Sequence, residues 1–172
     1  LARSLMASSD AKSALICNVQ SAAGRVFGQE ENRKEAQSAV PGDGCGVGYL
    51  VANDESPIQS IITKSYGAYA CDMQITARDD RKWWQPGESS FRIDFSRRKV
   101  GSIVQRANVL VPGIIEQACS EASMTKNDID LLVTNQPNPV FLRNWREALE
   151  VSKENHVDTF EDHGNLFGAA MP

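Results

Sequence analysis

Two turns in the last third of the sequence carry side chains that could do chemistry. The first is VTNQPNP at residues 133–139, and the second is DHGNLFG at residues 162–168. An asparagine amide can donate a hydrogen bond to a developing oxyanion without first gaining a proton, so Asn135 and Asn165 are candidate oxyanion donors. Loops at strand ends are held in place by a rigid sheet, which is why sites on α/β scaffolds often lie there. We therefore expect the function to lie where these two turns face.

The other reactive side chains favour structural roles. Cys119 falls on the packed face of a predicted helix, Cys45 stands in a crowded glycine turn, and His163 is typical of a hydrogen-bonding turn residue. The four cysteines have no paired spacing, which predicts reduced thiols that are mostly buried and a cytoplasmic protein. The two histidines have no partner at ligand spacing, so no metal site is predicted.

The overall composition bounds the class of protein. With 172 residues, the chain suits one ordinary domain or a large piece of a bigger one. A net charge of −4 argues against a nucleic-acid partner. No apolar run approaches the roughly 18 residues of a membrane span, so no membrane association is expected. Because the sequence opens on Leu1 within a predicted helix, we expect a fragment of a longer chain.

The first half of the sequence predicts strands. Residues 14–19 fit a strand buried on both faces, 20–40 a surface loop with room for a short helix, 46–52 a strand, and 57–76 another strand. The glycines of PGDGCG at residues 41–46 permit a tight turn and close backbone approach. A phosphate-binding loop needs a strand before its glycines and a helix after them. The glycines of residues 41–46 lead into a strand, so phosphate binding is not favoured here.

The second half alternates helices and strands. Residues 79–87, with Trp83 and Trp84, favour a turn-rich connection, and 100–122 favours an amphipathic helix with a kink or restart at Pro112. A buried strand at 129–133, a helix at 140–151 and an extended stretch at 156–160 then deliver the two asparagine turns. This order predicts a layered α/β fold.

Three segments, taken in order, resemble β-ketoacyl-acyl-carrier-protein synthase III. GDGCG at residues 42–46 resembles the family's GDGAGA turn, and IDLLVTNQPN at 129–138 resembles its stretch ending in HQAN. HGNLFGAAMP at 163–172 resembles its HGNTSAASIP. The resemblance implies a thiolase-like layered α-β-α-β-α fold, incomplete in this chain. Residues 1–78 would be the remainder of one thiolase-like half, and 79–172 the second half without its last strands.

The resemblance also implies the chemistry. In this family a cysteine is acylated by a thioester of coenzyme A or of a phosphopantetheine-bearing acyl carrier protein, with no tightly bound cofactor. Asn165 matches the family's catalytic asparagine and Asn135 stands where its histidine should be, while the nucleophilic cysteine would lie upstream of Leu1. Substrate-binding roles are implied for Gln136, Asn138, Gly164 and Arg143, the last at the pantetheine entrance, and a homodimer is the family expectation.

Asn135 is the departure that decides between activities. It cannot carry a positive charge or shuttle a proton near neutral pH, so its presence weakens decarboxylative condensation more than simple acyl transfer. We therefore favour a ketosynthase III-like acyltransferase of fatty-acid-like or secondary metabolism. Two alternatives remain open: a catalytically silent subunit of a heteromeric condensing enzyme, and a decarboxylative 3-oxoacyl-acyl-carrier-protein synthase III with a displaced base such as His163.

Overall fold

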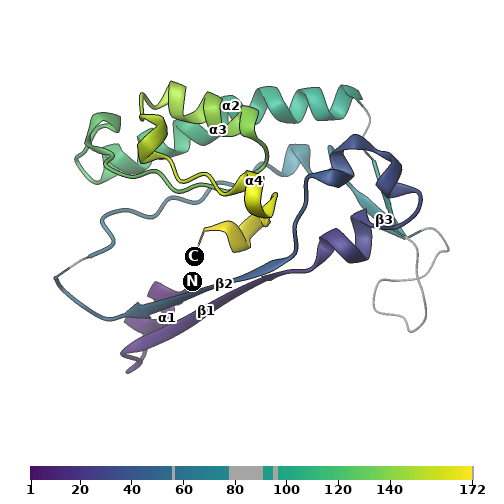
Figure 1. Ribbon diagram of the computed structural model, residues 1–172. Coiled ribbons are helices and arrows are strands. Elements are labelled where there is room, and N and C mark those ends of the chain that lie inside the picture. The colour runs from purple at the N-terminus through teal and green to yellow at the C-terminus, as the bar shows by residue number, and fades with distance from the viewer. Residues whose placement is uncertain (56, 78–90, 95–96, 172) are drawn as a thin grey trace.

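A helical pair and a β-hairpin lie on opposite sides of the C-terminal segment in the computed structural model (Figure 1). The structure describes residues 1–172 except 56, 78–90, 95–96 and 172. The pair consists of α2 (Arg97–Glu121) and α3 (Pro139–Ala148), and the hairpin of β1 (Ser13–Gln20) and β2 (Gly44–Val51). The C-terminal segment contains α4 (Phe160–His163) and the 3-10 helix η7 (Phe167–Ala170). The second asparagine turn belongs to this C-terminal segment, between the helical pair and the hairpin (Figure 1).

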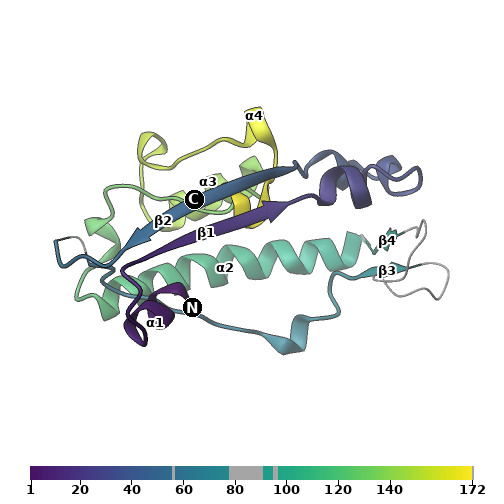
Figure 2. The same ribbon diagram turned by 90° about the horizontal axis from the view of Figure 1, so that it is seen from below.

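The hairpin is antiparallel, with a register that runs from Ser13↔Val51 to Gln20↔Gly44. Both strands were predicted, but β1 is not buried on both faces. Leu15 is 65% exposed and Tyr49 on the opposite strand is 70% exposed. The other face contacts η7, and a Cβ built on Gly168 would lie 2.3 Å from Asn18 Nδ2. Figure 2 shows the hairpin from below, with the short helix α1 (Ala2–Ala7) beside it.

The segment 20–40 was expected to be a surface loop with room for a short helix, and the structure confirms helical turns within it. It contains three short helices, η1 (Ala23–Phe27, π-helical), η2 (Asn32–Lys34) and η3 (Ala36–Ala39). Val26 and Phe27 are buried against Ile93 of β4, and Asn32 is 4% exposed. The Asn32 amide donates to the carbonyls of Val26 and Phe91 at 2.7 Å each, so a polar residue ties this segment to β4.

The predicted strand at 57–76 is mostly wrong. Only its end enters a sheet, as β3 (Ile75–Ala77) paired antiparallel with β4 (Phe91–Ile93). The rest is irregular apart from the 3-10 helix η4 (Gly67–Tyr69). Its alternating apolar side chains have no partner strand within the described residues, and Ile61 is 55% exposed. Alternation alone cannot make a strand where no neighbour offers a hydrogen-bonding edge.

The two long helices confirm the helical predictions. Helix α2 continues through Pro112, so the expected restart there is wrong. It packs against α3, where Trp145 Nε1 donates to the Ala107 carbonyl at 3.1 Å. Helix α3 buries Leu142 and the following Leu149 completely, and it ends before Glu150, whose φ is +58°.

The predicted strand at 129–133 is reduced to one parallel bridge between Leu132 and His156. Leu132 is 5% exposed, whereas Leu131 is 60% exposed and Val133 43% exposed. Before this segment lies the 3-10 helix η5 (Lys126–Asp128), which has a capping box formed by Thr125 and Asp128. A further 3-10 helix, η6 (Lys153–Asn155), precedes His156.

The structure contradicts the prediction about the cysteines and leaves the predictions about residues 78–90 untested. Cys17, Cys45 and Cys71 are exposed and Cys119 is half-buried, so the expectation of mostly buried thiols is wrong. Trp83 and Trp84 lie outside the described residues, as does the proposed boundary between 78 and 79, and the division into two halves stays a prediction. No helix in the described part of the chain is long and apolar enough to cross a membrane.

Candidate active site

The second asparagine turn is joined to the glycine-rich turn that precedes β2. Asn165 donates its backbone N–H to the Val40 carbonyl at 2.8 Å and accepts the N–H of Gly42 at 2.9 Å. These bonds flank a parallel bridge between Pro41 and Asn165. The backbone of Asn165 is therefore fixed on both sides by the segment 40–42.

Glycine is required on both sides of this junction. A Cβ on Gly42 would lie 2.1 Å from the His163 carbonyl oxygen, and a Cβ on Gly164 would lie 2.6 Å from the Val40 carbonyl oxygen. Gly164 also has φ +67° and ψ −161°, a region that is essentially restricted to glycine. Gly42 thus allows close backbone packing, and the structure gives Gly164, a predicted substrate-binding residue, a role in shaping the turn.

The Asn165 side chain is fixed through its oxygen atom, and its NH₂ group has no acceptor among the described residues. It is 7% exposed, and its Oδ1 accepts the Phe167 N–H at 2.8 Å. Among the described residues, none accepts a hydrogen bond from Nδ2. Because the oxygen is fixed by the backbone, the NH₂ group is left to donate to a bound molecule.

Asn165 lines a cavity of about 200 Å³ that also reaches the first asparagine turn through Pro137 and Asn138. Most of its lining is apolar and comes from η1, α2, α3 and the two turns: Phe27, Val40, Pro41, Met73, Val100, Ile103, Val104, Phe141 and Phe167. Gln37 and Asp94 are the other polar residues in the lining. An apolar cavity with a few placed polar groups is the usual form of a small-molecule site.

Asn138 reaches this cavity from the start of α3. Its Oδ1 accepts the Phe141 N–H at 3.0 Å, and Pro139 follows it as the first residue of the helix. This is the preferred arrangement for a helix N-cap, and it fixes the side chain at the cavity wall. The structure therefore brings Asn138 and Asn165 together, one from each turn.

Asn135 occupies a different position. It is half-buried, its Oδ1 accepts the Gln136 N–H at 2.8 Å, and it is not among the described residues that line the cavity with Asn165. The expectation that Asn135 and Asn165 share one oxyanion site has no support from this geometry.

Gln136 and Arg143 lie outside the described lining of the cavity that contains Asn165. Gln136 is 1% exposed; its amide donates to the carbonyls of Thr134 and Val157, and its Oε1 accepts the Thr159 N–H. Arg143 lies exposed on α3, with its Nε 4.0 Å from Glu147 Oε1, and it does not belong to the described lining of the cavity. Gln136 thus holds two loops together, which differs from the substrate-binding role expected from the sequence.

The residue that sequence reasoning missed is His156. It is 4% exposed, and its Nε2 lies 3.0 Å from Thr134 Oγ1, whereas His163, the expected alternative base, is exposed. Burial, aided by the positive charge of Arg146, lowers the pKa of His156. The one signal in the sequence was a histidine in an extended stretch expected to pack beside an apolar run.

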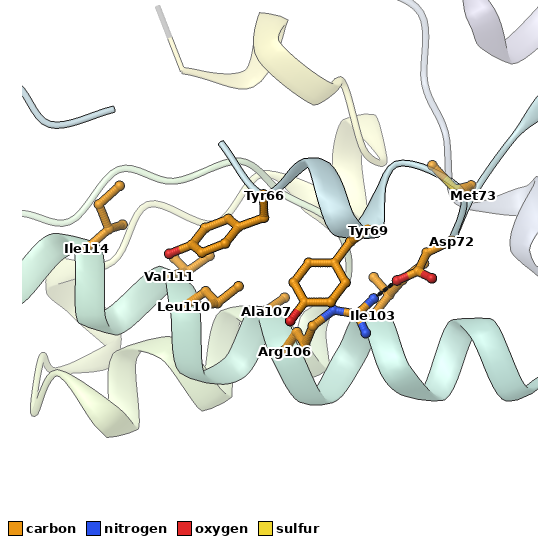
Figure 3. Close-up of a pocket in the computed structure, with 10 residues that line it drawn as sticks. All are labelled: Tyr66, Tyr69, Asp72, Met73, Ile103, Arg106, Ala107, Leu110, Val111 and Ile114. Atoms are coloured by element: carbon orange, nitrogen blue, oxygen red, sulfur yellow. Dashed lines mark hydrogen bonds and ion pairs between the residues drawn. The ribbon is translucent and has the colours of Figure 1, made fainter. Parts of the chain in front are cut away.

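A second, larger cavity of about 440 Å³ lies between η4 and α2 (Figure 3). The Arg106 guanidinium carbon is 4.0 Å from the centre of the Tyr69 ring, and Arg106 also pairs with Asp72. Met73 and Ile103 line both cavities, so the two are neighbours. The larger one contains neither asparagine turn.

Nowhere in the described ranges do three or more His, Cys, Asp or Glu residues gather as a metal-binding group would require.

Residues 119–172 match the model of the 3-oxoacyl-[acyl-carrier-protein] synthase III C-terminal family. β-Ketoacyl-[acyl-carrier-protein] synthase III of Pseudoalteromonas atlantica is 27% identical over 131 residues, 76% of this chain and 40% of that protein. The 2-heptyl-4(1H)-quinolone synthase subunit PqsC of Pseudomonas aeruginosa is 26% identical over 144 residues, 78% of this chain and 39% of that protein. The chain thus spans about 40% of the length of these relatives.

Solved structures share the fold. β-Ketoacyl-[acyl-carrier-protein] synthase III of Thermus thermophilus has a TM-score of 0.80 at 21% identity, covering 99% of this chain and 51% of its own. Cerulenin-bound OleA of Xanthomonas campestris has a TM-score of 0.71 at 14% identity, covering 98% and 49%. The chain is thus similar in sequence to synthase III proteins, most clearly over residues 119–172, and shares part of their α/β fold.

Proposed function

We propose that this chain is part of a ketosynthase III-like acyltransferase that moves an acyl group from a coenzyme A or acyl-carrier-protein thioester to an acceptor. The observation that carries the proposal is the Asn165 side chain, which lines an apolar cavity. Its oxygen accepts the Phe167 N–H, and its NH₂ group has no acceptor among the described residues. The similarity to synthase III proteins supports the thioester class of substrate.

In the proposed reaction a cysteine thiolate attacks the thioester carbonyl carbon. The carbonyl oxygen becomes an oxyanion, and Asn165 Nδ2 donates to it. Collapse of this intermediate breaks the bond to the original sulfur, which leaves as a thiolate, and the acyl group stays on the cysteine. The oxyanion gains most from a donor fixed in advance within an apolar, water-poor cavity, because no reorganisation is then needed.

The cavity also sets what the acyl group meets. Phe27, Phe141 and Phe167 contribute aromatic side chains to its wall, and Asn138 is fixed there by its capping hydrogen bond. We propose that the acyl chain packs on the apolar wall, with its carbonyl near Asn165. The nucleophile is proposed to be a cysteine upstream of Leu1, because no cysteine of the described residues lines this cavity.

A second function, a catalytically silent subunit of a heteromeric enzyme, is favoured by the position of Asn135. Its amide oxygen is bonded to Gln136 N–H, and Asn135 is missing from the described cavity lining that contains Asn165. A side chain so placed contributes no proton transfer there. The relative PqsC is itself named as a subunit of a synthase.

Intact-protein mass spectrometry separates these functions. The natural gene product is incubated with acyl-coenzyme A thioesters of increasing chain length and then digested to locate any adduct. A covalent acyl adduct on a cysteine supports the acyltransferase, and its transfer to an added carrier protein or amine identifies the acceptor class. No adduct with any thioester supports the silent subunit, whereas carbon dioxide release from malonyl-coenzyme A supports decarboxylative condensation.

The remaining expectations belong to the same proposal. A homodimer, an acyl-carrier-protein partner and a place in secondary metabolism follow from the family resemblance. Size-exclusion chromatography with light scattering measures the oligomeric state. Co-elution with a phosphopantetheinylated carrier protein measures the partnership.

A further inference from the structure

His156 forms a buried pair with Thr134, a residue of the first asparagine turn. His156 is 4% exposed and Thr134 is 6% exposed, and His156 Nε2 lies 3.0 Å from Thr134 Oγ1. A hydrogen bond between two buried side chains is costly to break, because each group is left without water as a replacement partner. The pair therefore fixes the side chain that precedes Asn135.

The backbone places these side chains next to each other. Leu132 donates its N–H to the Asn155 carbonyl at 2.8 Å, and its carbonyl accepts the Val157 N–H at 3.0 Å. These two bonds form the parallel bridge between Leu132 and His156. Thr134 lies two residues after Leu132, on the same side of this extended segment, which brings its hydroxyl to the imidazole.

Gln136, on the other side of Asn135, bonds to the same segment. We call the contacts of Thr134 and Gln136 with residues 156–159 the clamp. The Gln136 amide nitrogen donates to the carbonyls of Thr134 and Val157 at 3.1 and 2.9 Å. Its Oε1 accepts the Thr159 N–H at 3.1 Å. Asn135 thus stands between two residues that are both bonded to the segment 156–159. Its own side chain accepts only the neighbouring Gln136 N–H within the described chain, so its orientation depends on the clamp.

The surroundings of the imidazole favour its neutral form. Nδ1 is buried and makes no hydrogen bond of ordinary geometry among the described residues. The Leu142 backbone accepts from the imidazole and raises the pKa of His156, against the larger effect of burial. The contact with Thr134 joins a ring nitrogen and a hydroxyl, each of which can donate or accept. Protonation would make both ring nitrogens donors and place a charge in a buried site. Arg146 on α3 opposes that added charge and Asp158, on the same segment, favours it, while burial lowers the pKa of His156 overall.

We propose that His156 is a positioning residue, which in its neutral form holds Thr134 and thereby orients Asn135, and whose protonation loosens this turn by placing a charge in a buried site. The importance of Asn135 for catalysis rests on the proposed function, whereas the clamp itself does not. Protonation of His156 would thus make the orientation of the first asparagine turn depend on pH.

The test follows single residues by NMR in the ¹⁵N-labelled protein, from neutral pH to well below 6.5, the ordinary pKa of histidine. We expect the His156 imidazole to titrate with a midpoint below that value, and the backbone and side-chain amides of Asn135 to shift with the same midpoint. Thr134→Val keeps the size of the side chain but removes the hydroxyl, so His156 should still titrate while the Asn135 signals no longer follow it.

Two further variants complete the design. His156→Gln keeps a donor nitrogen but does not titrate, so it should preserve the Asn135 signals seen at neutral pH and make them independent of pH. His163→Gln removes the exposed histidine and should leave the coupling unchanged. The proposal is overturned if the Asn135 signals stay constant while His156 protonates, if they follow His163, or if all signals are lost together.

Catalysis provides a separate readout. In a gene product that forms the acyl adduct, we expect the acylation rate to fall as His156 protonates, and this limb of the pH profile to be absent in His156→Gln. An unchanged limb in that variant contradicts the proposal. If no adduct forms at all, the proposed function fails, and the NMR titration still decides whether the clamp exists.

Discussion

Gly42 and Asn165 lie side by side, with the N–H of Gly42 donating to the Asn165 carbonyl at 2.9 Å. This contact joins the turn before β2 to the turn that follows α4. Because Asn165 also lines the apolar cavity, the hairpin and the cavity wall share one junction. Changes at the junction should therefore alter both stability and acyl transfer.

Gly42→Ala should destabilise the protein. Its Cβ would lie 2.1 Å from the His163 carbonyl oxygen, a backbone atom that cannot move without displacing the turn. Overpacking of this kind costs about 1–3 kcal/mol. The measurement is the urea midpoint, followed by far-ultraviolet circular dichroism. Gly48→Ala is the matched control, because no atom lies within 4 Å of its added Cβ. Equal loss in both variants would mean that the junction is not tightly packed.

Gly164→Ala should be destabilising for two reasons. The backbone has φ +67° and ψ −161°, and the added Cβ would lie 2.6 Å from the Val40 carbonyl oxygen. Holding a non-glycine residue in such a conformation costs about 1–3 kcal/mol before any steric clash is counted. Gly113→Ala, inside α2 with open space around it, should instead stabilise by about 1 kcal/mol. Thermal unfolding compares the two, and a normal melting temperature for Gly164→Ala would contradict the assigned geometry.

Asn165→Asp should slow acylation while preserving the fold. Aspartate keeps an oxygen to accept the Phe167 N–H, but it replaces the free NH₂ group with a negatively charged oxygen. Loss of one oxyanion donor lowers the rate by about 10²–10³. The measurement is the rate of adduct formation by mass spectrometry. Asn127→Asp makes the same change at an exposed position and should have the parent rate. A normal rate for Asn165→Asp would exclude Asn165 as the donor.

Asn138→Ala should weaken α3 at its first turn. The substitution leaves the Phe141 N–H without the acceptor it has at 3.0 Å, and loss of such a cap typically costs about 1 kcal/mol. Asn138→Asp keeps the acceptor and adds a negative charge at the helix N-terminus, so its stability should match the parent. Chemical unfolding measures both variants, and equal stability for alanine and aspartate would show that the cap contributes nothing.

The protein should lose stability as the pH falls below 6.5. The pKa of folded His156 lies below this ordinary value, so the unfolded chain binds a proton at a higher pH than the folded one. The His156 contribution is therefore complete above 6.5 and is lost as the pH falls through the folded pKa. The difference in free energy of unfolding between parent and His156→Gln, measured across this range, should depend on pH. A constant difference would contradict the burial of a neutral imidazole.

Sequence patterns predicted the helices well because their stabilising contacts repeat within one element. The apolar residues of α2 and α3 recur at helical spacing, and the Pro-Gly pair at Pro112 and Gly113 did not break α2 because the rest of the helix stays packed on α3. Strands failed more often, since a strand depends on a neighbour. Leu132 has only the His156 segment beside it, and the stretch around Ile61 has none in the described residues.

The candidate site was predicted in part. The motif order pointed to Asn165 and to the glycine turn, but not to their direct contact, which joins segments far apart in the sequence. Gln136 and His156 show the same limit. Both are polar residues whose role depends on burial, and a turn motif cannot show whether an amide faces a substrate or a neighbouring loop.

The junction between Gly42 and Asn165 also affects how the protein is made. The glycine turn leaves the ribosome long before Asn165 is synthesised, so until then Val40 and Gly42 lack the partners for their backbone hydrogen bonds. Contacts between segments so distant in sequence slow folding, because the loop between them must first be ordered. Until Asn165 is made, the Val40 carbonyl and the Gly42 N–H are open to other partners, which makes early synthesis the stage at which this turn is most prone to misassembly.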